Sequence, residues 1–289
     1  MKKCRSERLT ICGLDYHLRL WGERDRPLMV MLHGWMDVSA SFQFLVDALA
    51  DRWQVVAPDW RGCGLTEWAQ GSYYFPDYLA DLDQILLHYS AGHPVHLVGH
   101  SMGGNVAGLY AGIRPERVAS LISLEGFGMP DSAADLAPAR YLKWLDQWRE
   151  SAVFKLYEDF SGVEARLKKT NSNLTDEKAA FLAQHWARQR EDGKVELLGD
   201  PRHKWTNPVL YRASEALACW RQIRAPVCWI SAKDSMLGRW FESDKAEKAR
   251  RMAAFRSIRY ETVTESGHML HHDQPAKVAQ LIETFLNEI

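Results

Sequence analysis

A serine flanked by glycines is the first feature of this sequence with the makings of a catalytic group. Residues 99–103 read Gly-His-Ser-Met-Gly; the apolar run 95–98 precedes them and a helical pattern over 102–113 follows. A sharp turn from a strand into a helix holds a serine hydroxyl above the edge of a sheet, and the helix N-terminus behind it favours a developing oxyanion. We therefore predict that Ser101 is the nucleophile of an acyl-transfer reaction.

Such a serine needs a general base, because its hydroxyl is a poor nucleophile at its own pKa. Among 11 histidines, His268 follows an expected strand at 258–263 and precedes an expected helix at 275–286. A loop there lies at the same sheet edge as Ser101, so we predict His268 as the base. His268 and His271 have a spacing that two metal ligands can share, but no further ligand cluster accompanies them in the sequence. We expect no metal and no cofactor.

The base in turn needs a carboxylate to fix its tautomer and stabilise its charged form. Asp234 follows the expected strand 227–231 and gives the chain order Ser, Asp, His. Glu125, at the end of the expected strand 118–124, is the alternative. The residues favour Asp234 and leave Glu125 open.

The oxyanion is expected to rest on two backbone amides. Met102 follows the nucleophile directly and supplies one N–H group. Trp35, in the loop after His33 and Gly34, supplies the other.

Elements that position these residues follow from the apolar pattern. Short, continuous apolar runs indicate strands buried on both faces, and apolar residues at helical spacing lie between them. Their alternation predicts a parallel sheet covered by helices on both faces. The expected strands are 28–32, 54–57, 95–98, 118–124, 227–231 and 258–263, and the expected helices are 41–49, 78–87, 102–113, 244–254 and 275–286.

Strand alternation stops between residues 126 and 225. This stretch has helical segments at 137–150 and 176–190 and is rich in tryptophan. A loop of that length without structure of its own is improbable. We predict a core of residues 1–125 and 226–289 and a mainly helical cap of residues 126–225. Its aromatic content predicts a small, apolar substrate.

Composition excludes other classes of function. The 289 residues carry a formal net charge of −1, without the basic stripe of a nucleic-acid binder, and no segment is apolar enough to span a membrane. The five cysteines are scattered and form no Cys-x-x-Cys pair, which favours a reducing, cytoplasmic location. We expect a monomer or homodimer.

Four motifs in order resemble those of the α/β-hydrolase superfamily: His-Gly-Trp at 33–35, Asp-Trp-Arg-Gly-Cys-Gly at 59–64, Gly-His-Ser-Met-Gly-Gly at 99–104 and Gly-His at 267–268. The resemblance implies a mostly parallel, eight-stranded sheet with the cap inserted after the sixth strand. More narrowly, residues 33–37, 125–128 and 207–212 are similar to the serine hydrolase-like subgroup.

Serine at position 101 distinguishes this chain from haloalkane dehalogenases and epoxide hydrolases of the superfamily, which use aspartate. The expected reaction is hydrolysis of a carboxylic ester of a small-molecule acyl substrate. Lactonase, thioesterase, carbon–carbon bond hydrolase and perhydrolase activities are alternatives within the superfamily. Alternatives of another class are a small-molecule receptor on a hydrolase scaffold and a purely structural, partner-binding protein.

Overall fold

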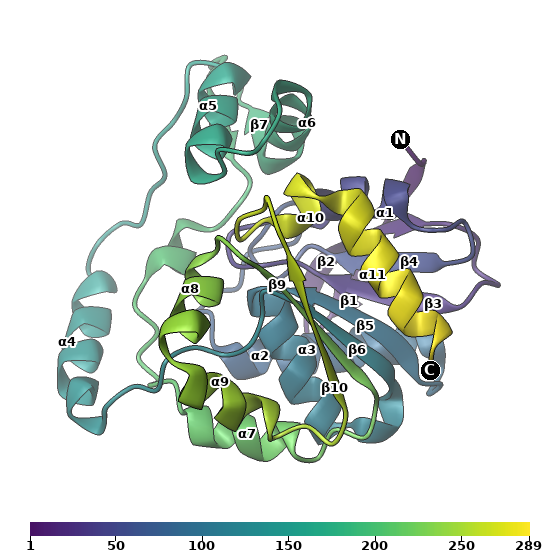
Figure 1. The fold of residues 1–289 in the computed structure, drawn as a ribbon. Coiled ribbons are helices and arrows are strands. Elements are labelled where there is room, and N and C mark those ends of the chain that lie inside the picture. Colours follow the sequence, from purple (N-terminus) through teal and green to yellow (C-terminus); the bar gives the residue numbers. More distant parts are fainter.

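The computed structural model describes residues 1–289, and its centre is an eight-stranded sheet with the strand order β1-β2-β4-β3-β5-β6-β9-β10 (Figure 1). The first three strands in this order are antiparallel neighbours, and all later neighbours are parallel. These strands are β1 (Cys4–Ile11), β2 (Leu14–Trp21), β3 (Leu28–Leu32), β4 (Gln54–Pro58), β5 (Val95–His100), β6 (Val118–Leu124), β9 (Val227–Ala232) and β10 (Ile258–Val263).

Helices cover both faces of the sheet because its central strands are apolar on both sides. One face packs against α1 (Gln43–Ala48), α10 (Leu270–Asp273) and α11 (Pro275–Asn287). The opposite face packs against α2 (Phe75–Ser90), α3 (Met102–Ile113), α7 (Ala213–Trp220) and α8 (Met236–Ser243), with α9 (Lys245–Met252) next to α8. The predicted fold, a mostly parallel eight-stranded sheet flanked by helices, is confirmed.

The N-terminal hairpin of β1 and β2 is an element that the sequence analysis did not predict. Its strands are joined by Cys12 and Gly13, both with positive φ, at 48° and 80°. Strand β1 lies at the edge of the sheet and is half exposed, so its side chains are mostly polar and its pattern is weak. Strand β2 is mostly buried, because it pairs with β4 and its apolar side chains pack with Val56 and Ile85.

Between β6 and β9 the chain leaves the sheet (Figure 1). In this view the helices of residues 160–170 and 176–186 lie above the core, and the helix of residues 137–147 lies to its left. A small apolar cluster of its own holds the upper part together. The predicted helix at 176–190 is shorter, because residues Ala187–Gln189 pair as a strand instead. The elements are α4 (Ala137–Gln147), α5 (Phe160–Thr170), α6 (Asp176–Trp186), β7 (Ala187–Gln189) and β8 (Val195–Leu197).

Helix α7 lies in the segment that the sequence analysis assigned to the cap, yet it packs against α3. Its side chains Ala216, Leu217 and Trp220 are buried in the same apolar cluster as the central strands. The division into core and cap remains a proposal, and α7 favours a cap that ends before residue 213. No helix is both long and apolar enough to cross a membrane.

A buried ion pair ties the N-terminal hairpin to the loop after β4 and to α2. Asp81 is fully buried and accepts hydrogen bonds from Arg61 at 2.6 and 2.7 Å and from the Tyr16 hydroxyl. Asp77 also contacts Arg61, at 3.1 Å, but its side chain is 39% exposed.

Replacing Asp81 with Asn should lower the free energy of unfolding by about 3–5 kcal/mol, because the Arg61 guanidinium would stay buried without its counter-ion. Asp77→Asn is the matched control and should cost about 1 kcal/mol or less, since that pair is screened by solvent. Urea unfolding of both variants measures the difference. Equal losses of unfolding free energy in the two variants would show that burial does not determine how much each ion pair stabilises the fold.

Candidate active site

Ser101 occupies a strained turn between β5 and α3. Strand β5 ends at His100 and α3 begins at Met102, so the turn has a single residue. Ser101 has φ 51° and ψ −114°, a conformation that residues with a side chain rarely adopt. Its backbone N–H donates to Leu124 O of β6 at 2.8 Å, which holds the turn in place.

The glycines around Ser101 are required by close backbone packing. A Cβ atom on Gly103 would lie 2.0 Å from the carbonyl oxygen of Leu32, and one on Gly99 would lie 2.4 Å from that of Gly103. Any larger residue would push α3 away from β3 and β5. The motif is therefore explained by the approach of helix to sheet.

His268 lies against Ser101, in the loop between β10 and α10. Its Nε2 is 2.9 Å from the Ser101 hydroxyl oxygen. Its Nδ1 is 3.1 Å from Glu125 Oε2. In the neutral tautomer the Nδ1–H group donates to the carboxylate and Nε2 accepts from the serine, which is the arrangement of a nucleophile, a base and an orienting acid. The structure thus brings two of the three predicted triad residues together.

The predicted acid, Asp234, does not contact His268. The carboxylate that does so belongs to Glu125. Asp234 lies exposed in the turn between β9 and α8, and its side chain makes no hydrogen bond. Glu125 directly follows β6, has φ 57°, and its side chain is fully buried. Its Oε1 accepts a hydrogen bond from the Ala232 N–H at 2.6 Å, so the other oxygen is left for His268.

The two acids were hard to separate because β6 and β9 are neighbouring parallel strands. Both acids follow carboxyl ends at one sheet edge, and both preserve the order Ser, acid, His. The local turn decides: positive φ directs Glu125 beneath the histidine, whereas the chain after Asp234 enters α8, capped by Ser235. The sequence analysis had left Glu125 open as the alternative acid, on its place at the end of the strand 118–124.

The residues of the two predicted oxyanion amides lie in segments next to Ser101. Met102 is the first residue of α3, so its N–H group has no partner within the helix. A Cβ atom on Gly34 would lie 3.3 Å from Ser101 Cβ, so the loop that carries Trp35 packs directly on the nucleophile. The side chain of Trp35 is 55% exposed, and its indole N–H donates to His203 O at 3.1 Å. Their role as oxyanion donors stays a prediction.

Buried polar groups fix the loop that carries Trp35. His33 Nδ1–H donates to Gly34 O, and its Nε2 accepts from the Trp60 N–H, each at 2.8 Å. Burial lowers the pKa of His33 to about 4, so this ring is neutral.

Asp59 accepts the Ser39 N–H at 2.7 Å and pairs with His17 at 2.8 Å. Burial opposes ionisation of Asp59, but the hydrogen bond and charge of His17 outweigh it and keep the pKa of Asp59 below its usual range.

Three more titratable residues lie buried behind the nucleophile. Burial raises the pKa of the Asp37 carboxyl to about 7, although the neighbouring Ser41 hydroxyl and hydrogen bonds from the Val38 N–H and the Trp186 indole lower it. Burial lowers the pKa of His100 and of His271 well below the usual value, so both imidazoles are neutral. The sequence analysis assigned none of the three a chemical role, although His100 and Asp37 were expected near the site.

Comparison with known proteins identifies the family. The model of the alpha/beta hydrolase fold family matches residues 27–275. The chain belongs to this family. It is 28% identical to a serine hydrolase-like protein of Danio rerio, over 99% of this chain and 90% of that protein. It is 26% identical to serine hydrolase-like protein 2 of Homo sapiens, over 93% and 89% of the two chains. The predicted likeness to the serine hydrolase-like subgroup is confirmed.

Other similar proteins of the alpha/beta hydrolase fold differ in their named reactions. A 2-(acetamidomethylene)succinate hydrolase of Mesorhizobium japonicum is 28% identical over 80% of this chain and 79% of its own. A thioesterase domain from the curacin biosynthetic pathway superposes with a TM-score of 0.87 at 24% identity, covering 98% of this chain and 99% of that one. The fold is therefore shared by hydrolases of several bond types.

Glu125→Gln should slow the phosphonylation of Ser101 by a fluorophosphonate about 10³–10⁴-fold, because an amide does not stabilise the imidazolium and permits the wrong tautomer. Asp234→Asn is the matched control and should change the rate less than about threefold, since that side chain is exposed and contacts neither His268 nor Ser101. Intact-protein mass spectra over time measure both rates. A large effect of Asp234→Asn with none of Glu125→Gln would restore Asp234 as the acid.

Proposed function

We propose that this member of the alpha/beta hydrolase fold family is a serine hydrolase that cleaves a carboxylic ester of a small, apolar substrate through an acyl-enzyme on Ser101. The observation that carries the proposal is the pair of hydrogen bonds of His268, to Ser101 Oγ at 2.9 Å and to Glu125 Oε2 at 3.1 Å. Nucleophile and base within hydrogen-bond reach, with the base oriented by a third group, are what nucleophilic acyl transfer requires.

In the first half-reaction, Ser101 Oγ attacks the acyl carbon while His268 Nε2 takes the hydroxyl proton. Glu125 holds His268 and stabilises its positive charge. The negative oxygen of the tetrahedral intermediate rests on the N–H groups of Trp35 and Met102. His268 then gives its proton to the leaving alcohol, and the acyl group stays on Ser101.

In the second half-reaction, water repeats the attack. His268 takes a proton from the water, whose oxygen bonds to the acyl carbon, and then returns that proton to Ser101 Oγ as the ester bond to the serine breaks. The side chain of His268 is 48% exposed, so water has a route to the base.

An apolar substrate is favoured by the side chains that remain exposed around the site. Trp35, directly after the glycine that touches Ser101, keeps 55% of its surface accessible. Comparison of p-nitrophenyl acetate, butyrate and octanoate tests this part. A fall in kcat/KM with each longer acyl group would contradict it.

Ser101→Ala should remove about 10³–10⁶ of kcat for the best of these esters, because the covalent route is lost while binding is kept. Steady-state turnover of the purified wild-type chain and variant gives the ratio, and fluorophosphonate labelling of Ser101 followed by peptide mapping places the nucleophile. Near-full activity in Ser101→Ala would sink the assignment.

The number of turnovers separates an enzyme from a receptor on the same scaffold. A hydrolase releases many equivalents of p-nitrophenol per chain, whereas a receptor that reacts once stops after one equivalent. Thioester and lactone substrates in the same assay test the neighbouring reaction classes.

A further inference from the structure

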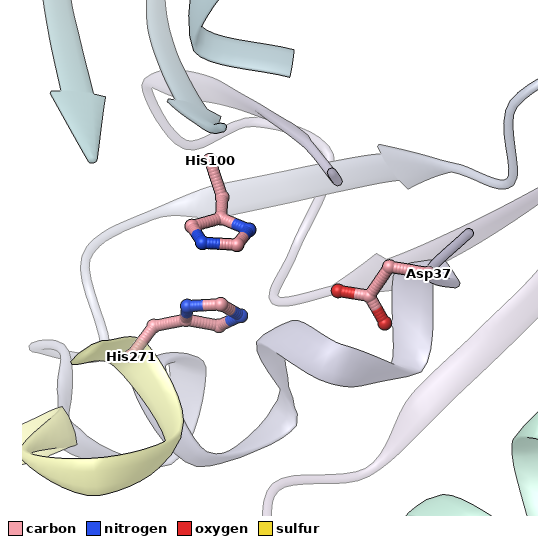
Figure 2. A group of neighbouring side chains, drawn as sticks. All are labelled: Asp37, His100 and His271. Carbon is pink, nitrogen blue, oxygen red and sulfur yellow. The ribbon is translucent and has the colours of Figure 1, made fainter. Parts of the chain in front are cut away.

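Asp37, His100 and His271 form a compact group behind the nucleophile, although 63 residues or more separate each of them from the next along the chain. They come from the loop after β3, from the last position of β5 and from α10. One possible ligand atom from each lies within 4.8 Å of the other two. Figure 2 shows the two imidazole rings close together, with centroids 4.3 Å apart and planes tilted by 50°, and an Asp37 oxygen directed toward them.

All three side chains are buried, and each has a polar atom without a partner. Asp37 is 4% exposed, His100 1% and His271 0%. The atoms without a hydrogen bond are Asp37 Oδ2, His100 Nδ1 and His271 Nδ1. Buried polar atoms are nearly always paired, because an unpaired one loses its hydrogen bonds to water without replacement. The unpaired atoms of Asp37 and His100 indicate a missing partner. His271 turns its Nε2 toward Asp37 (Figure 2), and this nitrogen lies 3.4 Å from Ser41 Oγ.

The tautomer of His100 shows what kind of partner is missing on its side. Its Nε2 is 2.8 Å from the main-chain oxygen of His268, an acceptor, so Nε2 carries the proton. His100 Nδ1 therefore presents a lone pair. The carboxylate of Asp37 likewise offers only lone pairs when ionised. A cation satisfies both.

We propose that Asp37, His100 and His271 bind a divalent transition-metal cation such as Zn²⁺. Two neutral imidazoles and one carboxylate are a ligand set that such ions take in proteins, with an open fourth position. Bonds of about 2.0–2.2 Å place ligand atoms roughly 3–4 Å apart in tetrahedral geometry. The possible ligand atoms lie within 4.8 Å of one another, so side-chain rotation must bring them closer together around a bound ion.

Binding at this site acts on the proposed base through the backbone. His100 donates to His268 O, and the two rings lie with centroids 4.8 Å apart. Ligation of His100 Nδ1 shifts that ring and the loop that holds His268. We expect the bound ion to lower ester turnover, and this effect rests on the proposed function, whereas binding itself does not.

Equilibrium dialysis of the chelator-treated full chain against Zn²⁺, with zinc counted by elemental mass spectrometry, tests the site. One ion per chain is expected. Asp37→Asn and His271→Gln should each weaken binding at least about tenfold, because each removes a ligand. His96→Gln is the matched control, since His96 bonds to Ser120 away from the cluster, and it should bind as the wild type does.

His268→Ala distinguishes this site from the proposed triad, whose His268 and Glu125 are also an imidazole beside a carboxylate. Retained zinc in His268→Ala supports the buried site. Loss there, together with unchanged binding in Asp37→Asn and His271→Gln, would overturn it, as would no bound zinc in the wild type. Binding without ester turnover would leave this site standing and remove only the proposed function.

A gain of signal guards against variants that merely misfold. His271→Cys places a thiolate in the proposed ligand set, so Co²⁺ bound to that variant should show a thiolate-to-metal absorption band that the wild type lacks. Thermal unfolding of every variant accompanies the measurement. Cobalt bound to a folded His271→Cys chain without that band would contradict ligation at residue 271.

Discussion

The one-residue turn at Ser101 is the constraint on which the rest of the site depends. Positive φ at this residue is unfavourable in isolation, and it persists because α3 is pressed onto the sheet at Gly103, where no side chain fits beneath Leu32 O. The strain is offset by the apolar cluster that α3 shares with β3, β5 and α7. Core packing therefore stabilises the strained turn that presents the half-buried Ser101 hydroxyl to His268.

Parallel strand order turns that single strained residue into a site. The carboxyl ends of β3, β5 and β6 lie side by side, so the loop of Gly34, the turn of Ser101 and the carboxyl group of Glu125 meet at one edge. Only His268 arrives from farther away, after β10, and it crosses β9 to reach Glu125. Its longer path explains why its loop needs further support, which His100 gives to its main-chain oxygen.

Buried polar residues around this edge show two different outcomes of the same physics. Asp59 is paired with His17 and with backbone N–H groups, so it stays charged and holds two loops in register. Asp37 is buried to a similar degree but retains an unpaired oxygen, and its pKa rises to about 7. The charge of Asp59 is therefore balanced by groups of the chain itself, whereas Asp37 is the carboxylate for which we propose a bound cation.

The sequence by itself determined the alternation of strands and helices, the strand-to-helix turn at Ser101 and the placement of His268 at the sheet edge. These follow from local signals: apolar runs, glycines two residues from a serine, and a loop between a strand and a helix. Only the tertiary structure decided that Glu125 and not Asp234 faces His268, that α7 packs on the core, and that Asp37, His100 and His271 meet. Each of these depends on how neighbouring strands align and on the direction that one turn gives a side chain. The spacing of residues in the sequence predicts neither the alignment nor the direction.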